Sequence, residues 1–244
     1  MNKGASMCCA AARSGTGGQR MGTIVLMGGN EFRPNCVAMD RSILGRMVGE
    51  PPRVVIVPTA AREGPSVVAR NGVGYFQSLG VEATAAMVIA RADAGDPHLA
   101  SLFCPTDLVY LTGGDPWHLL QTLRGSRVWA AIVQAWSAGA IIVGSSAGAM
   151  VLGNRMWWNG GWTDALGLAP GVAVLPHYRL IGSPKPEPGF GKLGGLTVLG
   201  IPEATACISE YGHAWLVAGE AKVAVFGEDR AEVYGGGEGF ALAA

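Results

Sequence analysis

Short runs of β-branched and other apolar residues recur along the first part of the chain, each ending in Gly, Pro, Thr or Ser. Such runs, bounded by turn-forming residues, are typical of buried strands. They span residues 22–29, 53–60, 83–90, 107–114 and 140–146. The segments between them have helical character and are long enough to cross a sheet, at 36–48, 65–79, 117–124 and 126–138. This alternation predicts a doubly wound α/β fold, with a mostly parallel sheet and helices on both faces.

The pattern changes after residue 200, where short apolar runs follow one another without helical segments between them. These runs lie near 205–209, 214–218, 222–226 and 231–234. Closely spaced strands joined by turns predict a C-terminal antiparallel extension of the same sheet. No linker composition marks a second domain, so we expect residues 21–244 to form a single α/β domain. Residues 1–20 show neither pattern, and we expect a flexible leader there.

Composition narrows the classes of partner. The 244 residues include 18 Lys and Arg against 18 Asp and Glu, so the net charge is zero and no basic excess is present to bind phosphates. Nucleic acid is therefore not an expected partner. Charged residues or glycines interrupt every apolar run before it reaches the roughly 18 residues of a spanning helix, so no membrane partner is expected either.

The cysteines bear on cellular location. Five are present, an odd number, without a CxxC pair and without a Cys/His cluster at zinc-ligand spacing. Neither a disulfide framework nor a metal site is indicated, and a cytoplasmic location is expected. The stretch 6–12 is also too short and too weakly apolar for the core of a signal peptide.

The clearest candidate for chemistry is the segment 144–149, GSSAGA, which follows an apolar strand and precedes a helix-compatible stretch. A serine on a sharp strand-to-helix turn needs small residues two positions to either side, and Gly144 and Gly148 meet that need around Ser146. Such a turn exposes the serine hydroxyl and directs the Ala147 amide at the position where an oxyanion forms. A glycine-rich turn with an incidental serine is the alternative interpretation.

A serine hydroxyl needs a base to remove its proton, and the chain has four histidines. His177 directly follows a short apolar strand, where catalytic loop residues commonly emerge, so it is the preferred base. His98 in a polar turn and His213 in a hairpin-like turn are expected on the surface. His118 starts a helix after the TGGDP turn and stays open as a less favoured base.

Two carboxylates are candidates for orienting the base. Glu203 lies in an apolar neighbourhood at the start of a strand, where an unpaired carboxylate would be costly to bury, so it is preferred. Asp164, among Gly and Trp in a predicted surface loop, stays open as the alternative. A second oxyanion donor is expected from the turn after the strand at 107–114, where Gly114 is preferred to Gly113 because a bare glycine amide can approach a carbonyl closely.

Several short motifs occur in a fixed order along the chain. They are GGN at 28–30, TGGD at 112–115, GSSAGA at 144–149, GLAPGV through PHY at 167–178, and GIPEATA at 200–206. Together they resemble the cyanophycinase and aspartyl dipeptidase (dipeptidase E) family of serine peptidases. The resemblance implies a class I glutamine-amidotransferase-like fold, with Ser146 as nucleophile, His177 as general base and Glu203 as orienting acid. It also implies oxyanion donation by Gly114 and Ala147.

On this resemblance the chain hydrolyses a peptide or isopeptide bond in a small peptide or amide substrate through an acyl-enzyme, without a cofactor. An amidase or glutaminase-like hydrolase on the same fold, and a catalytically silent ligand-binding homologue, are the alternatives. Family members carry several arginines after the histidine, whereas this chain has only Arg179 there. Gly113, Asp115, Arg179 and Trp158 are the expected substrate-binding residues.

Three tryptophans follow the nucleophile segment, at positions 157, 158 and 162. They could form an apolar wall for an uncharged or aromatic substrate side chain. A packed hydrophobic surface or a homodimer contact explains them equally well.

Overall fold

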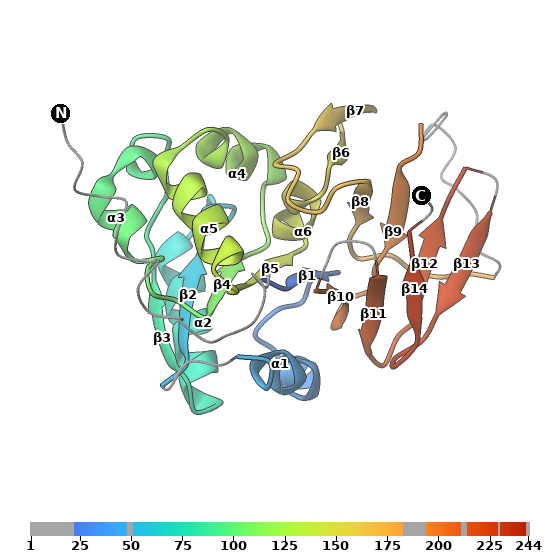
Figure 1. The fold of residues 1–244 in the computed structure, drawn as a ribbon, viewed down its shortest axis with the longest axis horizontal. Coiled ribbons are helices and arrows are strands. Elements are labelled where there is room, and N and C mark those ends of the chain that lie inside the picture. The colour runs from blue at the N-terminus through green and yellow to red at the C-terminus, as the bar shows by residue number, and fades with distance from the viewer. Residues whose placement is uncertain (1–21, 48–50, 183–193, 211–213, 229, 243–244) are drawn as a thin grey trace.

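The computed structural model describes residues 22–47, 51–182, 194–210, 214–228 and 230–242 (Figure 1). The leader expected over 1–20 and the surface position expected for His213 lie outside these residues. Five strands form the parallel part of the largest sheet: β1 (Ile24–Met27), β2 (Arg53–Val57), β3 (Glu82–Ala85), β4 (Leu108–Leu111) and β5 (Ile141–Ser145). Three antiparallel strands extend it: β10 (Thr205–Ser209), β11 (Ala214–Gly219) and β14 (Gly239–Ala241). The strand order is β14-β11-β10-β1-β5-β4-β2-β3.

Helices cover both faces of this sheet (Figure 1). They are α1 (Val37–Leu44), α2 (Pro65–Ser78), α3 (Pro97–Ser101), α4 (Pro116–Leu123), α5 (Arg127–Ser137) and α6 (Ala147–Leu152), with single 3₁₀ turns at Pro34–Cys36 and Asp93–Gly95. Buried residues of α1 and α2 share one core cluster with Val25 and Met27, whereas those of α3 to α6 share another with Ile24 and Leu26. Alternate side chains of β1 therefore point to opposite layers. This arrangement confirms the predicted doubly wound fold.

A second, four-stranded sheet lies beside the first one (Figure 1). It consists of β8 (Val172–Leu175), β9 (Thr197–Gly200), β12 (Val223–Phe226) and β13 (Ala231–Tyr234), in the order β13-β12-β9-β8. The antiparallel extension is confirmed for β10 and β11, and β14 adds a strand that the sequence did not predict, but the expectation that β12 and β13 join the same sheet is wrong. In β12, Val223 and Val225 pack on the main core while Ala224 and Phe226 build a third cluster. The apolar run thus predicted a strand but not its partners.

The hairpin of β6 (Arg155–Trp158) and β7 (Gly161–Asp164) forms a separate two-stranded sheet after α6. No helix in the described part of the chain combines the length and apolar character needed to cross a membrane. Within that same part, no group of three or more His, Cys, Asp and Glu side chains could hold a metal ion.

The described cysteines differ in state. Cys36 and Cys207 are free and buried, and burial raises the pKa of the Cys36 thiol to about 11, which keeps it protonated and unreactive. Cys104 is disulfide-bonded. The spacing of the cysteines along the chain gave no indication of this bond, because spacing in the sequence does not report distance in the fold.

Candidate active site

Ser146 lies at the junction between β5 and α6, where the chain turns sharply out of the sheet. Its backbone has φ 49° and ψ −108°, a left-handed conformation that is strained for a residue with a side chain. The Ser146 N–H donates to the Met27 carbonyl at 2.9 Å, and the Ser146 carbonyl accepts from the Met150 N–H at 3.0 Å. These bonds hold the strained turn from both sides, which fixes the direction of the serine side chain.

The two glycines around this turn are required by close backbone contacts. A Cβ atom on Gly144 would lie 2.5 Å from the backbone of Gly148, and one on Gly148 would lie 2.3 Å from the Leu111 carbonyl oxygen. Both distances are far below van der Waals contact, so no larger residue fits without a shift of the backbone. The sequence-based expectation that the turn needs small residues at these positions is confirmed.

His177 lies two residues after the end of β8, following Pro176, and has a positive φ of 54°. Its N–H donates to the Gly28 carbonyl at 2.8 Å, and the N–H of Tyr178 donates to the Ile201 carbonyl at 3.1 Å. The Tyr178 ring lies against Gly200, where a Cβ atom would come within 2.7 Å of the ring. The histidine loop is thus fixed to the end of β1 and to the second sheet.

Ser146, His177 and Glu203 form a continuous row of two hydrogen bonds. The Ser146 Oγ and the His177 Nε2 are 2.9 Å apart, and the His177 Nδ1 and the Glu203 Oε1 are also 2.9 Å apart. When Nδ1 carries the ring proton and donates to the carboxylate, Nε2 accepts from the serine hydroxyl. The histidine and glutamate side chains are 49% and 55% exposed, so water and substrate can reach this end of the row.

Gly28 and Gly29 directly follow β1 and lie against His177. Gly29 has φ 120°, and a Cβ atom there would lie 2.4 Å from the imidazole Cε1 of His177. A Cβ atom on Gly28 would lie 2.0 Å from the Pro202 carbonyl oxygen, and the Ala204 N–H donates to the Gly29 carbonyl at 3.1 Å. These two glycines therefore allow the loops that carry the histidine and the glutamate to meet the strand.

Two backbone amides near Ser146 have no acceptor among the described residues. They are the N–H of Ala147, which is the first residue of α6, and the N–H of Gly114 in the turn after β4. The first residue of a helix has no intrahelical acceptor for its amide. Gly114 has φ 137°, and a Cβ atom there would lie 2.1 Å from the Ala60 carbonyl oxygen, so this position requires glycine. Both amides are free to bind an oxyanion.

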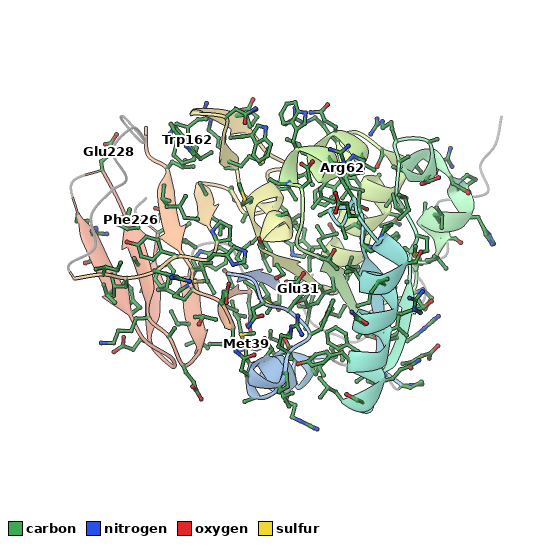
Figure 2. The ribbon with its side chains drawn as sticks, turned by 180° about the vertical axis from the view of Figure 1, so that it is seen from behind. Glu31, Met39, Arg62, Trp162, Phe226 and Glu228 are labelled. Atoms are coloured by element: carbon green, nitrogen blue, oxygen red, sulfur yellow. The ribbon has the colours of Figure 1, made fainter. Side chains whose placement is uncertain are left out.

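The amide of Gly113 is already occupied. It donates to the Glu31 Oε1 at 2.7 Å, so it is not free as an oxyanion donor, the role for which it was the second choice after Gly114. The other oxygen of Glu31 accepts from the buried Ser145 hydroxyl, also at 2.7 Å. Figure 2 shows Glu31 near the middle of the molecule, on the segment that follows β1.

Sequence reasoning did not identify Glu31, Gly28 or Gly29 as individual site residues. The GGN motif at 28–30 entered only as part of a family resemblance, and Glu31 follows it directly. Their contacts are with the segments near 113, 177 and 203, which are distant in sequence. The one available signal was an acidic residue at the carboxyl end of a parallel strand, where ligand sites are common.

Asp115, which the sequence predicts to bind substrate, is the N-cap residue of α4. Its Oδ1 accepts from the His118 N–H at 3.0 Å at the start of α4, and its Oδ2 lies 3.3 Å from the Arg62 guanidinium. Partial burial would raise the pKa of Asp115, but these hydrogen bonds and the Arg62 charge outweigh it and lower that pKa. The Asp115-Pro116 pair carried this signal in the sequence, since Asp is a favoured N-cap and Pro a favoured first helical residue.

The other candidate bases, His118 and His98, and the other candidate acid, Asp164, have surroundings in the described part of the chain that do not include Ser146 or His177. The His118 Nε2 is 2.8 Å from the Ile89 carbonyl oxygen, and His98 is exposed on α3. Asp164 is 85% exposed and pairs with Arg155 at 3.6 Å. The described contacts therefore connect only Glu203, of the two candidate acids, to His177.

The tryptophans pack within the fold. Trp157 and Trp162 form an edge-to-face pair with ring centroids 5.2 Å apart, and both pack on the third cluster, which includes Phe226. Trp158 is half-buried and packs on the main core. Arg179, in contrast, is exposed two residues after His177. Packing thus accounts for much of the indole surface, while the guanidinium stays open to solvent.

The sequence and the structure are similar to those of several peptidases. The family model described as "Peptidase family S51" matches residues 24–208. The cyanophycinase of Trichormus variabilis is 28% identical over 223 residues, covering 83% of this chain and 72% of that protein. The uncharacterized peptidase YgaJ of Bacillus subtilis is 28% identical over 168 residues, covering 65% and 69%. The crystal structure of a peptidase from an acI-B1 Actinobacterium has a TM-score of 0.78 and 26% identity, covering 92% of this chain and 98% of that one.

Proposed function

The chain belongs to peptidase family S51 and is a serine-type peptidase, and on that premise we propose that it cleaves peptide or isopeptide bonds through an acyl-enzyme on Ser146. The observation that carries the proposal is the row of two hydrogen bonds from Ser146 through His177 to Glu203. A serine attacks a carbonyl only when a base takes its proton, and this row supplies the base and a carboxylate to orient it.

In the proposed reaction, the Nε2 of His177 accepts the hydroxyl proton while the Ser146 oxygen bonds to the scissile carbonyl carbon. The carbonyl oxygen becomes an oxyanion, which the N–H groups of Gly114 and Ala147 stabilise. Collapse of this intermediate breaks the carbon–nitrogen bond, and the histidine returns the proton to the leaving amine. Water, deprotonated by the same histidine, then hydrolyses the ester and restores the serine.

Glu203 keeps the imidazole in the tautomer that accepts from serine. Its carboxylate accepts from Nδ1 and stabilises the imidazolium that forms when Nε2 takes the proton. Because both side chains are about half exposed, this ion pair is screened by water. We therefore assign Glu203 an orienting role in catalysis rather than a large contribution to folding.

Substrate selection is proposed to depend on a substrate carboxylate near the scissile bond. The exposed Arg179, two residues after His177, supports this, since a guanidinium can bind a carboxylate through two parallel hydrogen bonds. The relative from Trichormus variabilis is named a cyanophycinase, which supports cyanophycin as a further substrate to try. The packing of Trp157 and Trp162 on the third cluster gives less support to an aromatic substrate wall.

A panel of dipeptides tests the proposal. Peptides with aspartate, linked through either its α- or its β-carboxyl, are compared with peptides that begin with phenylalanine or alanine. We expect the wild-type protein to hydrolyse the aspartyl peptides at least about 10-fold faster, as removal of one charged contact implies. Ser146→Ala should abolish hydrolysis of every peptide while keeping its circular dichroism spectrum.

Two results would contradict the proposal. Undiminished hydrolysis by Ser146→Ala would remove the serine from the chemistry. Release of ammonia from glutamine without cleavage of any dipeptide would favour an amidase on the same fold.

A further inference from the structure

Glu31 joins the two turns that carry the proposed reaction. Its Oε1 accepts from the Gly113 N–H and its Oε2 accepts from the Ser145 hydroxyl, each at 2.7 Å. We propose that Glu31 is a positioning residue that holds the turn after β4 against the nucleophile turn, so that the two oxyanion donors point to one place. This inference rests on the proposed function.

The two contacts of Glu31 lie next to the proposed oxyanion donor and next to the nucleophile. Gly113 directly precedes the proposed donor Gly114, and Ser145 directly precedes the nucleophile Ser146. A Cβ atom on Gly113 would lie 3.0 Å from the Glu31 Oε1 and 3.3 Å from the Ser146 Cβ, so the carboxylate and the nucleophile border the same small space. A displacement of Glu31 would therefore be transmitted to both turns.

The carboxylate has no cationic partner within the described part of the chain, and the two neutral donors hold it in place. Hydrogen bonds to an ionised carboxylate are roughly twice as strong as bonds between neutral groups. Ser145 is fully buried at the end of β5, so its hydroxyl needs a partner. Glutamate supplies two acceptors at once, which fixes the distance between the two turns.

The backbone around Glu31 is held rigidly. Both neighbours, Asn30 and Phe32, have positive φ angles, 64° and 62°. The Asn30 carbonyl accepts from the Cys36 thiol, and the Phe32 ring packs on the rings of Phe76 and Tyr110. Strained residues of this kind persist where surrounding contacts fix them, and they concentrate at functional sites.

Alanine and glutamine at position 31 distinguish a positioning role of Glu31 from a role that needs its charge. Alanine at position 31 removes both acceptors, frees the Gly113 amide and allows the turn to shift. Glutamine can keep both contacts, because its Oε1 can accept from Gly113 while its Nε2 donates to the Ser145 oxygen, whose hydroxyl rotates. A positioning role therefore predicts that Glu31→Gln restores most of what Glu31→Ala loses.

The test is the rate at which an alkyl fluorophosphonate modifies Ser146. The serine oxygen bonds to phosphorus, fluoride leaves, the serine proton passes to His177, and the P=O oxygen of the adduct takes the oxyanion position. For Glu31→Ala we expect the limiting rate to fall about 100-fold with the half-saturating concentration nearly unchanged, as a displacement of about 1 Å implies. Glu31→Gln should stay within about 5-fold of the wild-type protein, because its two hydrogen bonds can be kept.

Two further variants keep the inference testable if Glu31→Ala does not fold. Ser145→Ala removes one of the two contacts and should lower the limiting rate about 10-fold, and an unchanged rate in this variant would overturn the inference. Glu63→Ala, which removes an exposed glutamate in the loop after β2, is the control and should leave the rate unchanged.

An unchanged limiting rate in folded Glu31→Ala would overturn the inference. So would equal losses in Glu31→Ala and Glu31→Gln, which would indicate a need for charge, or a loss confined to the half-saturating concentration, which would indicate substrate binding. Absence of labelling at Ser146 in the wild-type protein would instead refute the proposed function, so the two failures are distinguishable.

Discussion

The two halves of the candidate site are built in different ways. The nucleophile half consists of tight backbone contacts: Ser145 is fully buried and Gly144 and Gly148 exclude any side chain between them. The base half consists of two side chains, His177 and Glu203, that are about half exposed and held by hydrogen bonds. The fold therefore holds the attacking group and the oxyanion donors through close backbone contacts, while the side chains of the base and its carboxylate partner are open to water and substrate.

This difference predicts how each half responds to damage. A buried backbone contact cannot be relieved without moving the strand or the helix, so damage there costs stability as well as activity. A half-exposed side chain can move aside into solvent, so damage there costs mainly activity. Exposed ion pairs of the kind formed by His177 and Glu203 contribute little to the free energy of unfolding.

Alanine at Gly144 and alanine at Glu203 put this contrast to the test. The Gly144 Cβ would meet backbone atoms of Gly148, so we expect Gly144→Ala to lower the free energy of unfolding by about 2 kcal/mol or more and to abolish hydrolysis. The Glu203 side chain is 55% exposed and its contact with His177 is screened by water, so Glu203→Ala should cost about 100-fold or more in kcat/KM with a smaller loss of stability. Chemical denaturation and dipeptide kinetics measure both quantities. Equal stability losses would show that the two halves do not differ as described.

Local sequence patterns were enough for the nucleophile half but not for the contacts that join the halves. Gly144, Ser146 and Gly148 are contiguous, and a strand-to-helix turn imposes their spacing, so one short segment predicted the geometry. The row to His177 and Glu203 was predicted by weighing four histidines and two carboxylates, and the roles of those residues stay a prediction.

What the sequence did not reveal depends on tertiary contacts. Glu31 binds turns that are 82 and 114 residues away along the chain, and no local motif encodes those pairings. Likewise, β12 has the apolar pattern of a strand, but its pairing with β9 and β13 joins segments that no local pattern connects. Asp115 is a different case, because the Asp-Pro pair is a local capping signal and could have predicted its N-cap role, while its role in substrate binding stays a prediction.

We expect the smallest effect on activity from substitution of Asp40, a buried acid outside both halves of the site. Asp40 on α1 is 3% exposed and accepts from the Tyr75 hydroxyl at 2.6 Å. Burial raises the pKa of Asp40 to about 6, an effect that the Tyr75 hydrogen bond partly offsets. The folded protein thus binds a proton between about pH 4 and pH 6 that the unfolded chain releases, so this group stabilises the fold as pH falls through that range.

Asp40→Asn should remove this dependence. Relative to the variant, the wild-type protein should gain on the order of 2 kcal/mol of unfolding free energy between pH 7 and pH 4, as a pKa shift of this size implies. Urea denaturation at a series of pH values measures this gain. The value of kcat/KM at pH 7 should stay within about 2-fold of the wild type, because substitutions at distant sites without shared partners act independently. Tyr75→Phe is the matched variant and should move the dependence to higher pH. A pH-independent difference between wild type and Asp40→Asn would contradict the raised pKa.

The central claim is that His177 makes the Ser146 hydroxyl reactive enough to carry an acyl group. The most direct measurement is mass spectrometry of protein quenched with acid during turnover of p-nitrophenyl acetate, with the site of acetylation mapped to a residue. We expect the acetyl group on Ser146 in the wild-type protein, and a rate of formation about 10⁴-fold lower in His177→Ala. An acetyl group on another residue, or equal acetylation of Ser146 in both proteins, would contradict the account.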